Sequence, residues 1–249
     1  MLLAIDAGNS NIKLALFDGR ELVAQWHLTT DVARAAEDYP KEIPELFARK
    51  DLQAIAIASV VPALNPTLTR IAETHFRLQP LFVDHTTAGL KIVYDQPSDP
   101  GADRIVDAVA GVALYGAPCI VVDFGTATTF NVVNEAGEFI GGAISPGLKT
   151  CSEALFARTA KLPRVKFERP ERAIGSSTLA AIQSGIYHGY AGLVDGVLEK
   201  IIAELPVKPR VIATGGLAQS VAPASRYIEK VDDTLTLEGL RLVYERNKN

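Results

Sequence analysis

The sequence predicts an α/β protein made of two similar halves, each a mixed β-sheet flanked by helices, that face each other across a cleft. The main observation is an internal repeat. Leu2–Phe17 and Cys119–Val133 each read as an apolar run ending in Asp-x-Gly, a polar turn and an alternating strand. The Asp and the Gly of the two copies stand at one common offset. A repeat of this length indicates duplicated halves with a binding cleft between them.

The second observation is the order of elements in the first half, where three strands are followed by helices that alternate with strands. Asp18-Gly19 is a strong hairpin signal, and two prolines divide the helical composition of residues 31–50 into two short helices. A β-β-β-α-β-α-β order implies a mixed sheet flanked by helices. The expected later elements are a strand at Ala54–Val61, a helix from the N-cap Asn65 to about Arg77, and a strand at Leu81–Val83.

Lys91–Gly101 contains two prolines and is the expected boundary, which gives halves at residues 1–100 and 101–249. The second half begins with an amphipathic helix, and a long helix capped by Ser176–Thr178 carries glycines three or four residues apart. The expected elements are a helix at Ala102–Tyr115, the repeated unit with its third strand at Glu138–Ile140, helices at Leu148–Ala160 and Leu179–Leu205 (the latter divided near Gly192), an exposed loop at Leu162–Ala173, a strand at Val211–Ala213 and a helix at Leu235–Arg246.

Composition narrows the class of protein. The 249 residues are 48% hydrophobic and 22% charged, which is ordinary for a globular protein, and the net charge of -4 leaves no electrostatic footprint for nucleic acid. The sequence shows no signal-type apolar core and no apolar run of membrane-spanning length. The two cysteines form neither a disulfide framework nor a zinc pattern. We therefore expect a cytoplasmic protein that binds neither nucleic acid nor membrane.

Several residues have the chemistry of a phosphate site, although each has a structural alternative. Gly8 permits close approach of a ligand, the polar turn offers hydrogen-bond donors, and Lys13 adds positive charge. Taken alone, this stretch is better interpreted as an ordinary hairpin with polar turns. Asp103 is either a functional carboxylate or a charge that stabilises a helix start. The Gly215-Gly216 turn is a weak nucleotide signal, and His188 is best read as structural.

Two Asp-x-Gly hairpins and a later Gly-Gly turn resemble the actin-like (ribonuclease H-like) ATPase superfamily of sugar kinases, chaperone ATPases and actin. Within it, the chain resembles the type III pantothenate kinases over nearly its whole length. The motifs that carry the resemblance are DAGNS at Asp6–Ser10, PGADR at Pro100–Arg104, DFGTATT at Asp123–Thr129, GGAISPGL at Gly141–Leu148 and ATGG at Ala213–Gly216. Ser10 departs from the usual Thr of the family but keeps the hydroxyl.

The resemblance implies ATP-dependent phosphorylation of pantothenate at its primary hydroxyl, the first committed step towards coenzyme A. It also implies a homodimer, in which Thr178 would serve the neighbouring subunit's site. Asp103 corresponds to the catalytic base and Asp123 to the ligand of a monovalent cation, potassium or ammonium. The implied ATP-binding residues are Asp6, Ala7, Gly8, Asn9, Ser10, Asn11, Ile12, Lys13 and Thr126, and the implied substrate contacts are Tyr94, Gly101, Ala102, Asp103, Arg104 and Thr178.

These residue types suit phosphoryl transfer, which needs an aligned hydroxyl and cations that neutralise the phosphate oxygens. Asp103 can take the hydroxyl proton. Asp6 can hold a hydrated magnesium ion that bridges the ATP phosphates, because magnesium prefers oxygen ligands and keeps its waters. Two alternatives stay open: a kinase or phosphatase for another small hydroxylated metabolite, and a non-catalytic regulatory protein that keeps the nucleotide fold.

Overall fold

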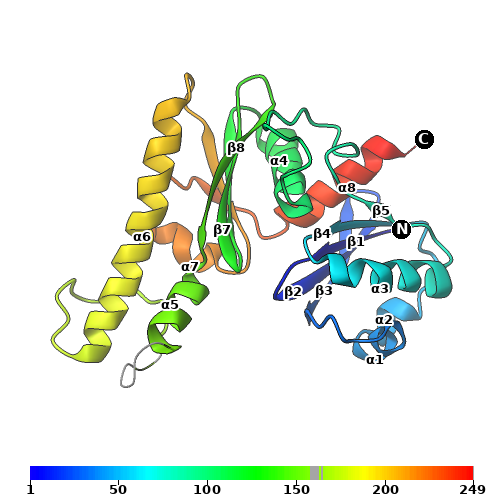
Figure 1. The fold of residues 1–249 in the computed structure, drawn as a ribbon, viewed down its shortest axis with the longest axis horizontal. Helices are drawn as coiled ribbons and strands as arrows, with labels where there is room; N and C mark the ends of the chain where they lie inside the picture. The colour runs from blue at the N-terminus through cyan, green and yellow to red at the C-terminus, as the bar shows by residue number, and fades with distance from the viewer. Residues whose placement is uncertain (158–162, 164, 249) are drawn as a thin grey trace. The chain divides into compact units, whose positions relative to one another are not determined.

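The computed structural model describes residues 1–157, 163 and 165–248, and it divides into two compact units (Figure 1). One unit consists of Met1–Ala113 together with the segment from Thr234, and the other is Leu114–Asp233. Each unit contains a five-stranded mixed sheet, so the duplication read from the sequence is a duplication of sheets.

The sheet of the first unit has the order β3-β2-β1-β4-β5. β1 is antiparallel to β2 and parallel to β4, and this central strand is buried along its whole length. The strands are β1 (Leu2–Ala7), β2 (Asn11–Asp18), β3 (Glu21–Thr29), β4 (Ala54–Ser59) and β5 (Leu81–Phe82). The predicted β-β-β-α-β-α-β order and the mixed sheet are confirmed.

Short helices cover one face of this sheet and form its main core with Leu3, Ile5, Ile55 and Ile57. They are α1 (Tyr39–Glu42), α2 (Pro44–Phe47) and α3 (Asn65–Arg70), which continues into a π-helical turn at Ile71–Phe76. The prediction that Asn65 is an N-cap is wrong. A 3-10 turn at Pro62–Leu64 leads directly into α3, so Asn65 already has helical backbone geometry and makes no capping bond.

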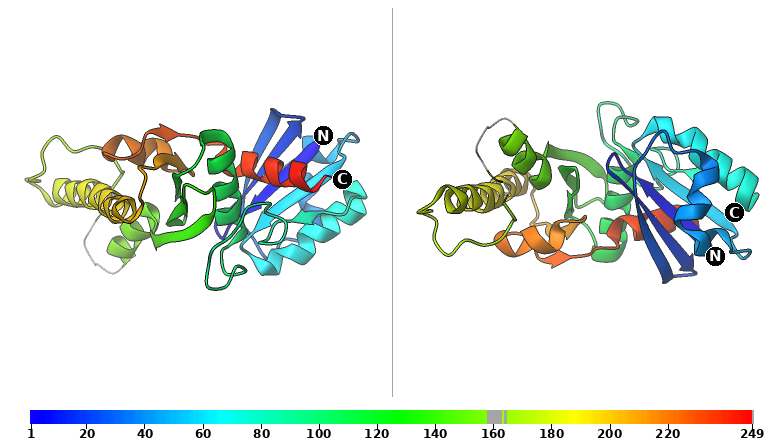
Figure 2. Two further views of the ribbon diagram at one scale, coloured as in Figure 1. Left: turned by 90° about the horizontal axis from the view of Figure 1, so that it is seen from above. Right: turned by 90° about the horizontal axis from the view of Figure 1, so that it is seen from below.

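Helices α4 (Ala102–Tyr115) and α8 (Leu235–Asn247) explain why the compact units differ from the predicted halves 1–100 and 101–249. α8 packs on β1, β2 and β4, and Figure 2 shows it lying across these strands. Gly239 of α8 lies against the Val106 carbonyl of α4, where a β-carbon would not fit. The Thr236 hydroxyl donates to Asp107 Oδ1 at 2.8 Å. Both helices therefore belong largely to the first unit.

The sheet of the second unit repeats the first with the order β10-β9-β6-β7-β8. Its strands are β6 (Cys119–Phe124), β7 (Ala127–Val133), β8 (Phe139–Pro146), β9 (Arg210–Thr214) and β10 (Lys230–Val231). β8 does not end at Gly141-Gly142 as predicted. These glycines have φ of 134° and 147°, and the register shifts beside them, so the strand passes through a bulge and continues.

The helices of the second unit are α5 (Leu148–Ala157), α6 (Thr178–Glu204) and α7 (Ala218–Val221), and they pack on β6, β7 and β9 through a second core. α6 runs unbroken through Gly192, contrary to the prediction. Its predicted cap is confirmed, since the Ser177 hydroxyl accepts from the Ala180 amide at 3.2 Å. The predicted end of α5 at Ala160 and part of the predicted loop 162–173 lie outside the described residues. No helix among the described residues is long and apolar enough to cross a membrane.

Candidate active site

The polar turn after β1 is held in one conformation by hydrogen bonds from its own ends and from the strand beside it. The Gly8 amide donates to the Asn11 carbonyl at 3.0 Å. Thr30, just after β3, donates from its hydroxyl to the Gly8 carbonyl at 2.6 Å and from its amide to the Ser10 carbonyl at 3.0 Å. The turn is therefore preorganised, and Thr30 is a supporting residue that the sequence reading missed.

The predicted ATP-binding stretch contains side chains of two kinds. Asn9, Ser10 and Asn11 are exposed, whereas Ala7 and Ile12 are buried in the core. Ala7 and Ile12 can therefore offer a ligand only their backbone.

Asp6 and Lys13 carry the charge of this loop. They face each other across the β1–β2 pair, and the Lys13 Nζ lies 3.9 Å from Asp6 Oδ2. Directly opposed residues of an antiparallel pair lie on the same sheet face. Asp6 is 9% exposed, so its carboxylate is largely withdrawn from solvent.

The second turn repeats this design with one residue fewer. The Gly125 amide donates to the Ala127 carbonyl at 3.0 Å, two residues on, where the first turn closes over three. Asp123 consequently pairs with Thr129, six residues later, while Asp6 pairs with Lys13, seven later. When the two copies of the repeat are aligned at their common sequence offset, Thr129 matches Ile12. The strand register shows instead that the structural counterpart of Thr129 is Lys13.

Helix α5 and the glycine just before it support the second turn by hydrogen bonding to one of its carbonyl groups. The Gly147 amide donates to the Thr126 carbonyl at 3.1 Å, and the Thr150 hydroxyl donates to the same carbonyl at 2.9 Å. Gly147 packs so closely on Gly125 and Thr126 that it has no room for a β-carbon. The Ser-Pro-Gly sequence before α5 was the available signal for this packing. The Thr126 side chain itself is exposed.

Oxygen atoms flank Asp123 on both neighbouring strands. Thr129 pairs with it on β7 and Thr214 pairs with it on β9, so the three side chains form one row on a single sheet face. Gly215, with φ of 93°, lies directly against the Asp123 carboxylate. Thr214 is 1% exposed, and its hydroxyl makes no hydrogen bond to any residue that the structure describes.

This donor set fits a cation that takes oxygen ligands. A buried hydroxyl without a hydrogen-bond partner costs free energy, and an ion accepting that oxygen as a ligand would offset the cost. At the Asp6 end the chain supplies a single carboxylate. No cluster of three or more His, Cys, Asp or Glu ligands occurs among the described residues, so a magnesium ion there would complete its shell with water and phosphate oxygens.

Asp103 lies in the first turn of α4 and is largely withdrawn from solvent. The Arg104 amide donates to its Oδ1 at 2.7 Å, which fixes the carboxylate at the helix start. Burial raises the pKa of Asp103 above its ordinary value of 3.8, while the hydrogen bond and positive charge of Arg104 oppose that rise. A raised pKa suits a general base, since the group becomes a better proton acceptor.

Contacts within the first unit connect Asp103 to the strand that carries Asp6. A β-carbon at Gly101 would lie 2.6 Å from Asp103 Oδ1 and 3.0 Å from a methyl group of Val60. The Val60 amide in turn donates to the Ala7 carbonyl at 3.1 Å. Gly101 therefore packs the start of α4 against Val60, which is itself hydrogen-bonded to the end of β1.

The other predicted substrate residues fall in two places. Tyr94 lies beside Arg104, with the guanidinium carbon 6.0 Å from the ring centroid, and Ala102 is buried. Thr178 is an exposed residue in the first turn of α6, in the second unit. The structure thus brings Tyr94, Gly101, Asp103 and Arg104 together.

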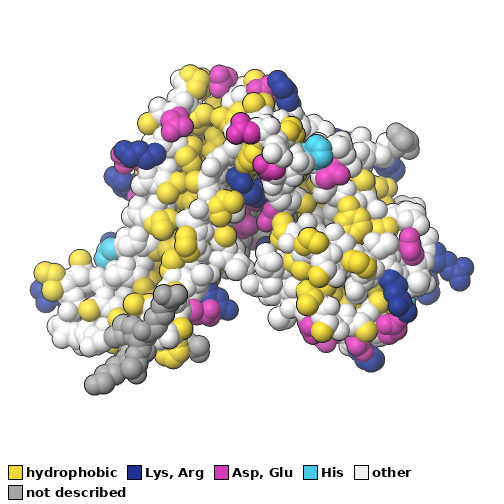
Figure 3. All heavy atoms as spheres, viewed as in Figure 1, with side chains coloured by type: hydrophobic (Ala, Val, Ile, Leu, Met, Phe, Trp, Pro, Cys, Tyr) yellow, Lys and Arg dark blue, Asp and Glu magenta, His cyan; other side chains and the backbone are white. Residues whose placement is uncertain are grey.

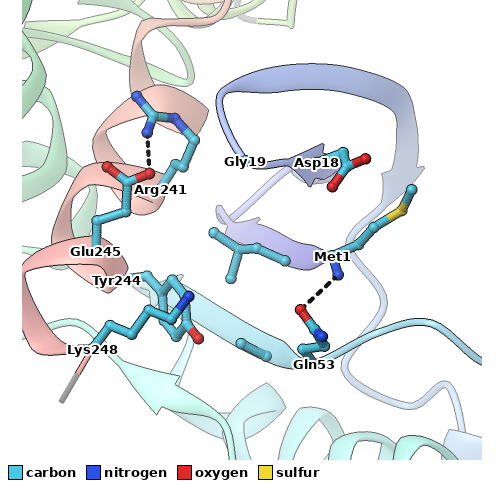
Figure 4. A pocket seen from close by; sticks show the side chains of 10 residues that line it. Met1, Asp18, Gly19, Gln53, Arg241, Tyr244, Glu245 and Lys248 are labelled. Carbon is cyan, nitrogen blue, oxygen red and sulfur yellow. Dashed lines mark hydrogen bonds and ion pairs between the residues drawn. The ribbon is translucent and has the colours of Figure 1, made fainter.

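A cavity of about 100 Å³ opens elsewhere on the first unit, at the opposite end of its sheet (Figure 4). It is lined by Met1, Asp18, Gln53 and residues of α8. Arg241, its most buried cation, is already paired with Glu238 at 2.8 Å and Glu245 at 2.7 Å. This cavity contains none of the predicted site residues.

Comparisons with known proteins identify the family of the chain. Residues 2–200 match the family model described as type III pantothenate kinase. The type III pantothenate kinase of Geobacter sulfurreducens is 50% identical over 254 residues, which cover 100% of both chains.

Two solved structures share the fold at low sequence identity. Component A of the (R)-2-hydroxyglutaryl-CoA dehydratase of Acidaminococcus fermentans has a TM-score of 0.57 at 16% identity and 99% coverage of both chains. The activator of the 2-hydroxyisocaproyl-CoA dehydratase of Clostridium difficile has a TM-score of 0.55 at 13% identity, covering 100% of this chain and 98% of its own. These likenesses and the two five-stranded mixed sheets confirm the predicted duplicated α/β fold.

Proposed function

Since this chain belongs to the type III pantothenate kinase family, we propose that Asp103 is the catalytic base of its reaction. The chain is a kinase that uses ATP to phosphorylate pantothenate at its primary hydroxyl, the first committed step towards coenzyme A. The proposals below concern which residues do this and which ions take part.

The observation that carries the proposal is the environment of Asp103. Its carboxylate is partly buried, has a raised pKa, and is oriented by the Arg104 amide at 2.7 Å. The base takes the hydroxyl proton as the pantothenate oxygen attacks the γ-phosphorus of ATP and the bond to the leaving ADP oxygen breaks. Pantothenate is bound by Tyr94, Gly101, Ala102 and Arg104. The Arg104 guanidinium pairs with the carboxylate of pantothenate.

The two Asp-Gly turns bind ATP in this proposal. The stretch Asp6–Lys13 supplies backbone amides, the exposed polar side chains Asn9, Ser10 and Asn11, and the positive charge of Lys13. Thr126 supplies a further contact from the second turn. Thr30 and Gly147 hold the two turns in shape through the hydrogen bonds described above.

Two cations complete the proposed site. Asp6 would hold a hydrated magnesium ion, which would neutralise negative charge on the phosphates of ATP. Asp123 would hold a monovalent cation, potassium or ammonium, which would offset negative charge near the phosphates. The oxygen-only surroundings of Asp123 and the buried hydroxyl of Thr214 support this second assignment.

We also propose that the protein is a homodimer, in which Thr178 serves the site of the neighbouring subunit. Four glycines of α6, at positions 185, 189, 192 and 196, are exposed, and a β-carbon at each would meet nothing within 4 Å. Hydrophobic side chains also lie at the surface around the start of this helix (Figure 3), with Leu179 52% exposed and Ile174 87% exposed. A second copy packed there would bury both features.

An ATP-consumption assay with pantothenate, with and without potassium, tests the proposed reaction and its cation. We expect turnover that needs pantothenate and rises when potassium replaces sodium. Equal rates in both salts would remove the assigned role of Asp123. A panel of other hydroxylated metabolites separates this activity from the alternative of another small-molecule kinase, and a protein that binds ATP without turnover on any of them would match the non-catalytic alternative.

A further inference from the structure

The two units differ in the side chains that neighbour the carboxylate at the end of the central strand. In the first unit, the row of side chains across the sheet at Asp6 contains Lys13 on β2 and Ala58 on β4. Lys13 places its ammonium 3.9 Å from the carboxylate. The chain itself thus supplies a cation to this partly buried charge.

The matching row of the second unit contains no lysine. It reads Thr129 on β7, Asp123 on β6 and Thr214 on β9. Thr129 stands at the register position of Lys13, and Thr214 at that of Ala58. Compared with the row of the first unit, this row has a hydroxyl in place of the lysine ammonium on one side. On the other side it has a second hydroxyl in place of the alanine methyl group.

These two exchanges have one physical explanation. Positive charge stabilises a partly buried carboxylate. Where the row has no lysine, an external cation can add positive charge, and it needs oxygen ligands from the chain. The Thr214 hydroxyl is buried and makes no hydrogen bond to a residue that the structure describes, so its oxygen is available as such a ligand. The Thr129 hydroxyl is already an acceptor for Asn131 Nδ2 at 3.3 Å.

We propose that Thr214 is a ligand of the monovalent cation held at Asp123, and that Thr129, in the place of a lysine, makes the enzyme depend on that ion. This inference rests on the cation assigned under the proposed function. It predicts that a lysine at position 129, with its ammonium beside Asp123 as the Lys13 ammonium lies beside Asp6, replaces the monovalent ion.

The test compares three variants of the full-length chain with the wild type: Thr129→Lys, Thr129→Met and Thr214→Val. Thr129→Met is the matched control, since it has a long side chain without charge. Each protein is melted in potassium chloride and in choline chloride, and pantothenate phosphorylation is measured in the same buffers. The melting midpoint reports binding of the ion without reference to turnover.

We expect potassium to raise the melting midpoint of the wild type. Thr129→Lys should lose this response and should phosphorylate pantothenate in choline chloride within about tenfold of the wild-type rate in potassium, whereas Thr129→Met should lose the response and remain inactive without potassium. Thr214→Val keeps the shape of the side chain but loses the oxygen, so its half-saturating potassium concentration should rise by about tenfold or more.

A Thr129→Lys enzyme that still requires potassium, or a Thr214→Val enzyme with an unchanged potassium midpoint, would overturn the inference. If Thr129→Lys does not fold, Thr214→Val decides alone. A wild type that phosphorylates pantothenate but responds to potassium in neither measurement would refute the inference and leave the kinase activity intact. A wild type that is stabilised by potassium but never phosphorylates pantothenate would refute the reaction instead.

Discussion

Replacing Asp103 by Asn separates catalysis from structure at one position. Asn has nearly the same shape as Asp, and its Oδ1 can still accept the 2.7 Å hydrogen bond from the Arg104 amide. Asn also cannot act as a base at neutral pH. We therefore expect turnover to fall by about two to four orders of magnitude, which is the usual contribution of general-base catalysis. ATP binding should persist, because the Asp6–Lys13 loop is unchanged.

The same substitution should change stability little, because two effects oppose each other. Loss of the negative charge at the start of α4 removes about 0.3–1 kcal/mol of favourable interaction with the helix dipole. Loss of a buried charge relieves the desolvation that raises the pKa of Asp103. The net change should stay below about 1 kcal/mol, which corresponds to a shift of about 2–4 °C in melting temperature for a chain of this size.

The pH dependence of stability and of turnover follows from the direction of the pKa shift of Asp103. Because the folded protein holds the Asp103 proton more tightly than the unfolded chain, this carboxyl contributes stability at acid pH that is lost as pH rises through its raised pKa. Asp103→Asn should therefore gain stability relative to the wild type as pH rises from the ordinary value of 3.8 through the raised pKa of the folded protein. The wild-type rate should rise with pH over the same window, as the base loses its proton, and the variant should lack this rise.

Steady-state kinetics and thermal melting on one purified variant provide the assay. Asp107→Asn is the matched control, since Asp107 lies one turn later in α4, is 1% exposed and accepts a hydrogen bond from Thr236. That variant should be active at near wild-type turnover in its folded form. A stable Asp103→Asn enzyme with near wild-type turnover would refute the assignment of the base.

Three further predictions concern packing and assembly. Gly239→Ala should destabilise the protein by about 1–3 kcal/mol in urea unfolding, because the new methyl group meets the Val106 carbonyl, and an unchanged unfolding midpoint would contradict the described contact. Ser177→Ala should cost about 1 kcal/mol through loss of the α6 cap, measured in the same way, and Ser177→Thr should retain most of it. Gly189→Leu should convert a dimer to monomers in sedimentation equilibrium at micromolar concentration, and a wild type that sediments as a monomer would exclude the proposed homodimer.

Much of the fold could be predicted from the sequence because its determinants are local. The alternation of apolar residues predicted β2 and its counterpart β7, and the Asp18-Gly19 turn predicted the first hairpin. The Ser177 cap is likewise a local signal, and it marks the start of α6. The DAGNS, PGADR and DFGTATT motifs identified the family without a structure.

The tertiary structure decided what depends on contacts between distant segments. α8 belongs with the first unit because Gly239 and Thr236 contact α4 more than a hundred residues earlier in the sequence, as their contacts with Val106 and Asp107 show. No local pattern predicts such a contact.

Contacts between distant segments also decide which features of the candidate site the sequence could not predict. The sequence by itself determined that two aspartates end two similar strands, and that a third begins a helix. It could not determine that the second turn is one residue shorter, because register is set by strand pairing across the sheet. Only that pairing shows that Thr129 stands where the first unit has Lys13, and only β9 brings Thr214 beside Asp123 from ninety-one residues away in the chain.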